Sequence, residues 1–351
     1  MNPSPPAGPL VSVIVLNYNG ARWLDRCLKS IRAQTIFDKS EIIVADNNSP
    51  DGSDRMAAEI MQGWPDARVI QHGENLGYCE GNNRAAAQAR GTYLLFLNND
   101  TWLEPTYLEA FLAETARAHA CAATPLVMNY DDDSFQSLGA SGFDIFGLIT
   151  LFQSHADTRE VFMPDGCSYL IQRELFEKLG GFDNKLFMFA DEADLSWRVW
   201  ISGERAVAVP SARMHHRSGA NVNPAGGGTM AEYRTSDTKR YFANRNSLVL
   251  LLKNARNILL LLVFLQLCML AAEAVVGLFL VRRWSFVKRA YLDAVKDCWG
   301  LRHHILAERR RIRGFRRRGD FWMLRFLRLR PNRWAELQRV RQSGIPRVTP
   351  A

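Results

Sequence analysis

Between Leu10 and about Val127 the chain alternates short apolar runs with amphipathic segments, and this alternation constrains the fold more than any other feature. Such a pattern is typical of parallel strands joined by crossover helices. Helices are expected where Leu24, Leu28 and Ile31 repeat at helical spacing and in the alanine-rich stretch 82–90. The sequence therefore predicts an α/β domain with a mostly parallel, Rossmann-like sheet, whose strands are 11–16, 41–45, 68–71, 93–97 and 121–128.

Polar side chains follow three of these predicted strands, at the point where each strand ends. They are Asn17-Tyr18-Asn19, Asp46-Asn47-Asn48 and Asn98-Asn99-Asp100. Open α/β sheets bind ligands outside the carboxyl ends of their strands. We therefore expect a polar crevice along this edge of the sheet.

The middle of the chain is less regular. Residues 129–165, with Asp131-Asp132-Asp133 and several glycines, are expected to form loops and a bend, and no chemistry is assigned to them. Helices are predicted over 168–180, closed by Gly180-Gly181, and over 192–202. The glycines at 226–228 are expected to form a mobile loop.

The last part of the chain combines an apolar stretch with basic clusters. Residues 258–281 are long enough to cross a bilayer, although Gln266 and Glu273 leave open whether they span it or lie in the interface. The formal charge of +8 arises from residues 282–351, which hold 20 Lys/Arg and 5 Asp/Glu. Clusters such as Arg309–Arg311 and Arg316–Arg318 follow an apolar segment, which favours an anionic membrane surface over nucleic acid.

Two further features bear on the compartment. The six cysteines show no C-x-x-C spacing, so neither a zinc ribbon nor a disulfide scaffold is indicated. Residues 1–9 lack a basic segment followed by an apolar run, so no secretory signal is expected there. The sequence predicts a flexible start (1–9), an α/β domain (10–245) and a helical membrane-association region (246–351) at the cytoplasmic face of the cell membrane.

Seven motifs occur in an order that resembles the family 2 glycosyltransferases of the GT-A fold, in their rhamnosyltransferase-like branch. They are VSVIVLNYNG at 11–20, IIVADNNSPDGS at 42–53, NLGYCEGNNRA at 75–85, LFLNNDT at 95–101, GGFD at 180–183, FADEADLSWR at 189–198 and HHRSG at 215–219. The resemblance implies an inverting enzyme that moves a sugar from a nucleotide-sugar to a lipid-linked or polysaccharide acceptor in cell-envelope glycan synthesis. It leans towards dTDP-rhamnose as donor, with UDP-linked sugars second.

The resemblance places Asp46 at the nucleotide-binding aspartate, where its carboxylate accepts hydrogen bonds from a base or a ribose hydroxyl. A turn-forming role for Asp46 is the alternative. Gly77 and Gly81 permit close approach of the backbone to phosphate or sugar. The full set expected to bind the donor is Asn17, Tyr18, Asn19, Asp46, Asn48, Gly77, Gly81, Asn82, Asn98 and Asn99.

A divalent metal, Mn²⁺ or Mg²⁺, is expected to neutralise the pyrophosphate leaving group. Asn98-Asn99-Asp100 stands where GT-A enzymes carry Asp-x-Asp, with the first acid replaced by an amide, so Asp100 is the expected metal ligand. The distal histidine of the family falls on His215 or His216, of which His215 is preferred. An N-cap role for Asp100 is compatible with this.

Inverting transfer needs one general base to deprotonate the acceptor hydroxyl. Glu192 resembles the family's base, although the usual residue there is Asp, and Asp191 is expected to orient the acceptor. Carboxylates at a helix start are also favoured by the helix dipole alone. Asp194 is expected to act as a local brace.

Two other functions compete with sugar transfer. A nucleotidyltransferase of similar architecture needs a Gly-rich loop with catalytic Arg and Lys after the first strand, where only Arg22 is present. A non-catalytic, membrane-anchored protein that binds nucleotide-sugars would leave the acidic pair inert.

Overall fold

The computed structural model describes residues 8–152, 159–217, 234–332 and 347–349. Most of the predicted flexible start and the glycine loop at 226–228 lie outside these residues. The chain divides into two units: unit 1 holds residues 1–140, 151–187 and 204–218, and unit 2 holds 141–150, 188–203 and 219–351. The predicted boundary at residue 245 does not coincide with this division.

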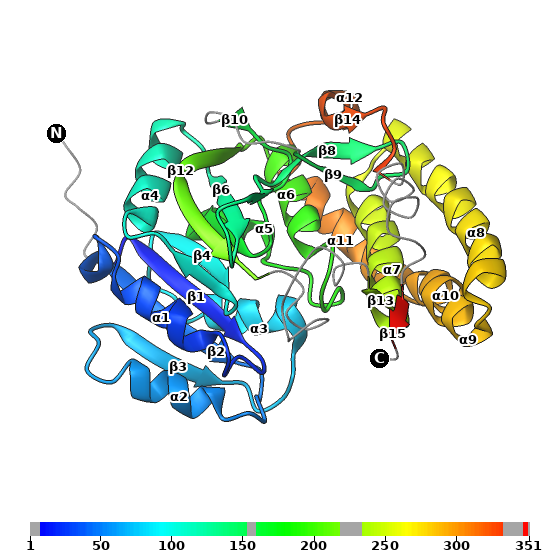
Figure 1. Cartoon of the computed structure of the whole chain (residues 1–351). Helices are drawn as coiled ribbons and strands as arrows, with labels where there is room; N and C mark the ends of the chain where they lie inside the picture. Colours follow the sequence, from blue (N-terminus) through cyan, green and yellow to red (C-terminus); the bar gives the residue numbers. More distant parts are fainter. Residues whose placement is uncertain (1–7, 153–158, 218–233, 333–346, 350–351) are drawn as a thin grey trace. The chain divides into compact units, whose positions relative to one another are not determined.

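Unit 1 is built on one mixed sheet with the order β10-β12-β6-β11-β4-β1-β2-β3 (Figure 1). Strands β3, β2, β1 and β4 are parallel, whereas β11 is antiparallel to both β4 and β6. Short strands β5 and β7 extend the sheet at β12 and β6. The strands are β1 Val11–Asn17, β2 Ser40–Asp46, β3 Ala67–Gln71, β4 Tyr93–Asn98, β5 Thr101–Leu103, β6 Ala122–Asn129, β7 Phe135–Ser137, β10 Arg159–Glu160, β11 Ser168–Gln172 and β12 Ala206–His216.

Helices flank this sheet and bury their apolar faces on it. On α1, Leu24, Leu28 and Ile31 are fully buried against β-strand residues such as Val13 and Val44, as the helical spacing predicts. Most of the remaining helices of unit 1 connect one strand of the sheet to the next strand along the chain. The helices are α1 Leu24–Arg32, η1 Phe37–Lys39, α2 Ser53–Ile60, α3 Gly77–Ala86, α4 Tyr107–Arg117 and α5 Arg173–Leu179.

All five predicted strands are confirmed within one or two residues, but the segment after them is not. The helix expected over 168–180 is wrong in its first part: Ser168–Gln172 forms β11, and the helix α5 begins at Arg173. The β11 backbone completes the ladders of β4 and β6, which a local pattern does not reveal. Gly180, with φ of 80°, ends α5 as predicted.

Unit 2 is mainly helical, and it includes the predicted helix at 192–202 and the apolar helix at 258–281. A small sheet, β14-β8-β9, comes partly from the region that was expected to form loops. The elements are β8 Ala140–Asp144, β9 Ile149–Leu151, α6 Asp191–Ile201, β13 Arg234–Ser236, α7 Asp237–Asn254, η3 Ile258–Leu260, α8 Leu261–Val281, α9 Trp284–Val287, π-helix η4 Lys288–Asp293, α10 Ala294–Gly300, α11 Arg302–Phe315, α12 Asp320–Met323, η5 Leu324–Phe326, β14 Leu327–Arg328 and β15 Arg347–Thr349.

Part of the basic cluster is used inside unit 2 rather than on a free surface. The Arg309 guanidinium donates to the carbonyl of Ala255 at 2.7 Å, just after α7. Arg316 donates to the carbonyl of Asn254 at 2.5 Å, and Arg318 donates to Trp200 and Gly203 at the end of α6. Cations are favoured at helix C-termini, where carbonyls lack helical partners. These three arginines therefore cap helices, a role that the sequence pattern did not indicate.

Candidate active site

The polar ends of β1, β2 and β4 meet at one edge of the sheet, as predicted. Asn17 pairs with Asp46 across the β1–β2 ladder, and Leu16 pairs with Asn98 across β1–β4. The buried Asn17 amide donates to the Asp46 carboxylate at 2.7 Å and accepts from Asn99 Nδ2 at 2.8 Å. One hydrogen-bonded cluster therefore joins the ends of three strands.

The Asp46 carboxylate also organises the turn that follows β2. Its Oδ2 accepts from the backbone N–H of Ser49 at 2.8 Å, and its Oδ1 accepts from the Ser49 hydroxyl at 2.6 Å. The turn-forming alternative is therefore realised in the structure. Beside it, Asn19 and Asn48 adopt positive φ values of 54° and 62°, and Tyr18 and Asn48 are exposed. The side chains of Tyr18, Asn19 and Asn48 are exposed at this edge, and contact between the predicted set and the donor stays a prediction.

The glycines of the 75–85 motif have a packing role within unit 1. Gly77 has φ of 72°, and a Cβ there would lie 2.5 Å from the Phe187 ring. The backbone N–H groups of Tyr78 and Cys79, at the start of α3, both donate to the Phe187 carbonyl. Gly81 lies against Leu16 and Asn47. The chain itself thus occupies part of the helix start that the sequence suggested for the donor.

Asp100 lies between β4 and β5, and the histidine beside it is His216. The His216 Nε2 atom is 3.4 Å from the Asp100 carboxylate. Burial lowers the pKa of His216, but the charge of Asp100 and its hydrogen bond raise it overall. Burial raises the pKa of Asp100, but His216 and Arg217 lower it overall. Each group thus favours the charged form of the other.

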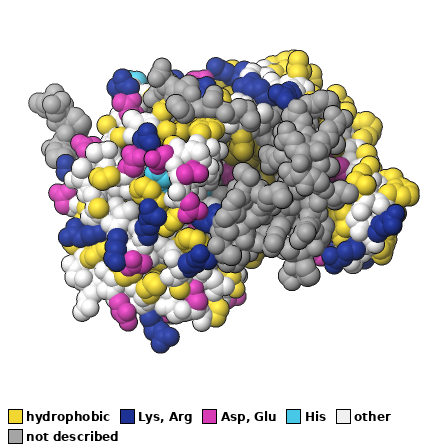
Figure 2. Space-filling model, viewed as in Figure 1, with side chains coloured by type: hydrophobic (Ala, Val, Ile, Leu, Met, Phe, Trp, Pro, Cys, Tyr) yellow, Lys and Arg dark blue, Asp and Glu magenta, His cyan; other side chains and the backbone are white. Residues whose placement is uncertain are grey.

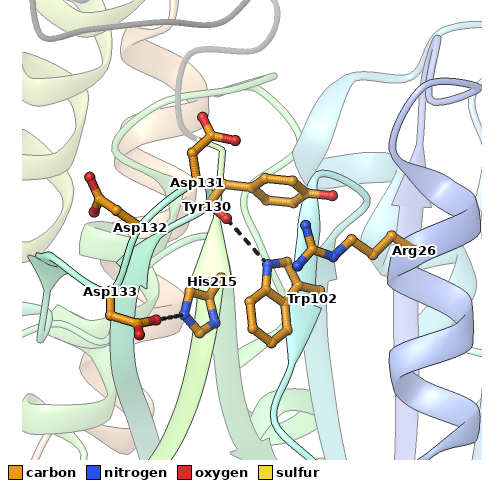
Figure 3. Close-up of a pocket in the computed structure, with 7 residues that line it drawn as sticks. All are labelled: Arg26, Trp102, Tyr130, Asp131, Asp132, Asp133 and His215. Atoms are coloured by element: carbon orange, nitrogen blue, oxygen red, sulfur yellow. Dashed lines mark hydrogen bonds and ion pairs between the residues drawn. The ribbon is translucent and has the colours of Figure 1, made fainter.

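His215, the histidine preferred from the sequence, is placed elsewhere because side chains alternate across a strand. Its Nε2 lies 2.9 Å from Asp133, and its ring stacks on Trp102 with centroids 3.7 Å apart. Arg26 of α1 covers the Trp102 ring and also approaches Tyr130 (Figure 3). Together with Asp131 and Asp132 these residues line a cavity of about 310 Å³. His215 therefore belongs to this aromatic and acidic pocket.

The geometry around Asp100 and His216 fits a divalent cation. The Asp100 carboxylate and the His216 imidazole, 3.4 Å apart, are an oxygen and a nitrogen donor of the kinds that bind Mg²⁺ or Mn²⁺. The His216 Nδ1 atom lies 2.8 Å from Gln136 Oε1, which orients the ring and can keep the Nδ1 proton, so that Nε2 would be able to release its own proton and bind a cation beside Asp100. Among the described residues no group of three or more His, Cys, Asp or Glu could hold a metal. A cation held by Asp100 and His216 alone would need further ligands from phosphate and water, as is usual for Mg²⁺ sites.

The predicted acidic pair lies in unit 2, at the start of α6. Asp191 is buried, and its pKa is raised, first by that burial and then by the negative charges of Glu192 and Asp194. The two residues before it, Phe189 and Ala190, have positive φ values of 66° and 63°. Non-glycine residues held in this region store strain and are often found at functional sites.

Asp194 braces α6 against α7, as expected. Its carboxylate accepts from Arg198 at 2.8 Å, from Lys253 at 3.1 Å and from Asn254 at 2.7 Å. Asp194, Arg198 and Lys253 are all buried. The acidic residues of α6 therefore divide into a pair at its first turn and one carboxylate fixed inside unit 2.

Two residues that contact His216 or the backbone just before Asp191 were not predicted from the sequence. Gln136 contacts His216, and Asn246 of α7 donates to the carbonyls of Met188 and Phe189 at 2.7 and 2.9 Å. Both are single amides in segments without a motif, and their partners lie 80 and 57 or 58 positions away. No local pattern signals such contacts.

The fold has counterparts among solved structures. The *Staphylococcus aureus* TarS 1–349 complex with UDP superposes with a TM-score of 0.55 at 17% identity, over 87% of this chain and 88% of that one. The mannosyltransferase PcManGT from *Pyrobaculum calidifontis*, in complex with GDP-Man and Mn²⁺, gives 0.51 at 20% identity, over 84% and 88%. With the sheet order above, these likenesses define the class: the chain has a GT-A-like α/β fold with a mixed sheet flanked by helices.

Sequence comparison then gives a family match. Residues 12–180 match the model described as Glycosyl transferase family 2, and this match supports a glycosyltransferase. It is 26% identical over 267 residues to the N-acetylglucosaminyl-diphospho-decaprenol L-rhamnosyltransferase of *Mycobacterium tuberculosis*, covering 68% of this chain and 85% of the relative. It is 27% identical over 228 residues to the O-antigen biosynthesis protein RfbC of *Myxococcus xanthus*, covering 61% of this chain but 18% of that longer protein. Among the three functions considered, the match supports the glycosyltransferase.

Proposed function

We propose that this glycosyltransferase inverts the anomeric centre of a nucleotide-sugar, with rhamnose as the favoured sugar, and transfers it to a lipid-linked or polysaccharide acceptor in cell-envelope glycan synthesis. dTDP-rhamnose is the favoured donor, and UDP-linked sugars are second. The supporting relatives are named for rhamnosyl transfer to a decaprenol-linked sugar and for O-antigen synthesis. The apolar helix α8 and the basic residues around it support work at the cytoplasmic face of the membrane.

The observation that carries the proposal is the Asp100–His216 pair at the polar edge of the sheet. A carboxylate and an imidazole 3.4 Å apart, with the imidazole oriented by Gln136, form two adjacent ligands of suitable chemistry. A bound divalent cation supplies positive charge for the pyrophosphate that leaves. Asp100 is thus proposed as a metal ligand, with His216 in place of His215.

Glu192 is proposed as the general base and Asp191 as the residue that orients the acceptor. The raised pKa of Asp191 keeps its carboxyl protonated over a wider pH range. Within the pair, a neutral Asp191 leaves the negative charge to Glu192, which then accepts the acceptor proton. Asn246 donates hydrogen bonds to the backbone just before the pair, and these bonds limit the movement of that backbone.

The test is nucleotide release by purified full-length protein with several nucleotide-sugars and added Mn²⁺ or Mg²⁺. Glu192→Gln should lower kcat by roughly 10²- to 10⁴-fold because it removes the base. Asp191→Asn is the matched control: it mimics the protonated acid, so its loss should stay within about tenfold. Asp100→Ala should abolish the metal dependence of turnover.

The anomeric configuration of the product reports the inverting mechanism directly, and NMR of the product measures it. Wild-type turnover in both Glu192→Gln and Asp100→Ala would refute the site as proposed. Retention of configuration would refute the single-displacement chemistry while leaving the family assignment intact.

A further inference from the structure

Helix α8 has an exposed apolar surface that runs along its whole length. In its first half Leu262, Gln266, Met269 and Leu270 are buried, which leaves one side open. From residue 271 onward most of the helix is exposed. Figure 2 shows hydrophobic side chains along this helix, at the right of the view, and basic ones near its end. The exposed large apolar residues are Leu261, Phe264, Leu267, Val275, Val276, Leu278, Phe279 and Leu280, which we call the α8 apolar face.

The segment before α8 is fixed to the rest of unit 2. The buried Asp320 carboxylate accepts from the backbone N–H groups of Arg256, Asn257 and Leu259, at distances between 2.7 and 3.1 Å. Arg309 adds a hydrogen bond to the carbonyl of Ala255. The segment before α8 is thereby tied to residues that follow it by more than 50 positions.

The segment after α8 turns back at once onto the helix that precedes α8. Arg282 has φ of 53° and ends α8. The Tyr241 hydroxyl of α7 donates to Asp297 at 2.7 Å, and the Asn244 amide of α7 donates to the Ala290 carbonyl at 2.9 Å. Helices α7, η4 and α10 thus form one packed layer against which α8 lies.

This connectivity is incompatible with a transmembrane α8. Its 21 residues would measure about 31 Å at 1.5 Å per residue, enough to reach the opposite surface. Crossing the bilayer would carry the packed neighbours into the hydrocarbon beside it. Those neighbours include Lys288, Asp293 and Asp297, and charged groups at that depth are costly.

We propose that α8 lies in the plane of the bilayer and inserts its apolar face into a single leaflet, so that both of its ends stay on the same side. Arg282 and Arg283 are exposed at its end, where they meet anionic headgroups. Trp284 and Trp299, which are 58% and 71% exposed, sit at the headgroup level that tryptophan prefers. The proposal rests on the proposed membrane association but not on sugar transfer.

The test uses the full-length protein bound to phosphatidylglycerol-containing vesicles. Among the described cysteines, Cys268 is the one that is exposed, and it is first replaced by Ser. Single cysteines introduced at Phe264, Leu267, Val275 and Phe279 then carry a fluorophore. Quenching by lipids labelled at known depths should give one shallow depth at all four positions. A depth profile that is deepest at the middle of the helix would overturn the proposal.

A second readout separates the two orientations by sidedness. Cysteines introduced at Asn257 and Ser285 should both react with a membrane-impermeant maleimide added outside the vesicles. Protection of one of them would show a span. Flotation with the vesicles compares two matched variants. Phe279→Leu should bind to the vesicles like wild type, whereas Phe279→Asp should lose most of the vesicle-bound fraction.

Lipid composition and self-association complete the design. Replacing Arg282 and Arg283 by Gln should weaken binding to anionic vesicles by roughly fivefold for each charge, with little effect on phosphatidylcholine vesicles. Absence of flotation together with a concentration-dependent dimer in light scattering would overturn the proposal in favour of a second copy of the chain. Nucleotide release with a soluble acceptor is measured on the same variants, so a failed membrane proposal is distinguishable from a failed catalytic one.

Discussion

At the scale of single residues, the two adjacent histidines of β12 show how strand geometry divides neighbours. His216 lies beside Asp100, whereas His215 stacks on Trp102 and contacts Asp133. The motif at 215–219 indicates that a histidine belongs near the metal but does not choose between the two. The choice depends on which residue of β12 pairs with Thr101, and that pairing is a long-range property.

The histidine pair offers a direct prediction. His216→Phe should weaken Mn²⁺ activation of turnover by about 100-fold or more, because it removes a proposed ligand. His215→Phe keeps a flat ring against Trp102, so activation should change by less than about tenfold. Titrating Mn²⁺ against nucleotide release measures both, and a larger loss in His215→Phe would return the ligand role to His215.

At the scale of elements, the contacts between helices explain which expectations were local and which were not. The periodicity of Leu24, Leu28 and Ile31 was sufficient for α1 because the helix buries one regular face. The strand β11 was missed because its state depends on β4 and β6 on either side. The polar strand ends were predictable, since parallel strands align their carboxyl ends, but the Gln136 and Asn246 contacts join distant segments and were not.

The α6–α7 brace should be a major source of stability in unit 2. Asp194→Asn leaves the buried Arg198 and Lys253 facing a neutral amide, and we expect a loss of about 3 to 5 kcal/mol in the free energy of unfolding. Glu177→Gln removes an exposed ion pair with Arg173 and should cost at most about 1 kcal/mol. Denaturant titration monitored by tryptophan fluorescence compares them; equal losses would contradict the brace.

The start of α3 should be sensitive to a single methyl group. Gly77→Ala requires both an unfavourable φ and a displaced Phe187, whereas Gly73→Ala has a similar φ of 76° and nothing within 4 Å of the new Cβ. We expect Gly77→Ala to destabilise the protein by about 1 to 3 kcal/mol more than Gly73→Ala. Thermal unfolding of the two variants isolates the clash, and matching Tm values would mean that Phe187 moves aside freely.

At the scale of the whole molecule, the family motifs predicted the GT-A-like fold and the polar edge of the sheet, while the arrangement of unit 2 could not be read from them. Its helices are joined by contacts between segments that can be more than 100 positions apart, such as Arg318 with Trp200. The apolar and basic composition indicated a membrane-facing region but not that several arginines serve as helix caps. Composition reports how many charges are present, and packing decides where they are used.

Acid stability should depend on one buried carboxylate. Burial raises the pKa of Glu41, but hydrogen bonds from Ser12, Arg90 and Arg68 outweigh this and lower it to about 2 from 4.5. Because the folded pKa lies below the unfolded value, the stabilisation is complete above pH 4.5 and is lost as the pH falls towards about 2.

Glu41→Gln should therefore lower the free energy of unfolding by about 2 kcal/mol at neutral pH and flatten its dependence on pH in the acid range. Urea titrations between pH 7 and pH 3 measure this. Glu59→Gln changes an exposed carboxylate and should leave the acid profile of the wild type in place; an unchanged profile in Glu41→Gln would contradict the prediction.

The caps that Arg317 and Arg318 place on α6 have a practical consequence. The backbone N–H groups of both residues donate to the Ile201 carbonyl, at 2.7 and 3.0 Å. The helix that begins with Asp191 and Glu192 is therefore capped by residues that follow α8 in the sequence. Cutting the chain after α7 to obtain a lipid-free enzyme would remove these partners. A soluble variant is better sought by replacing outward-facing residues of α8 one at a time, keeping its covalent path intact.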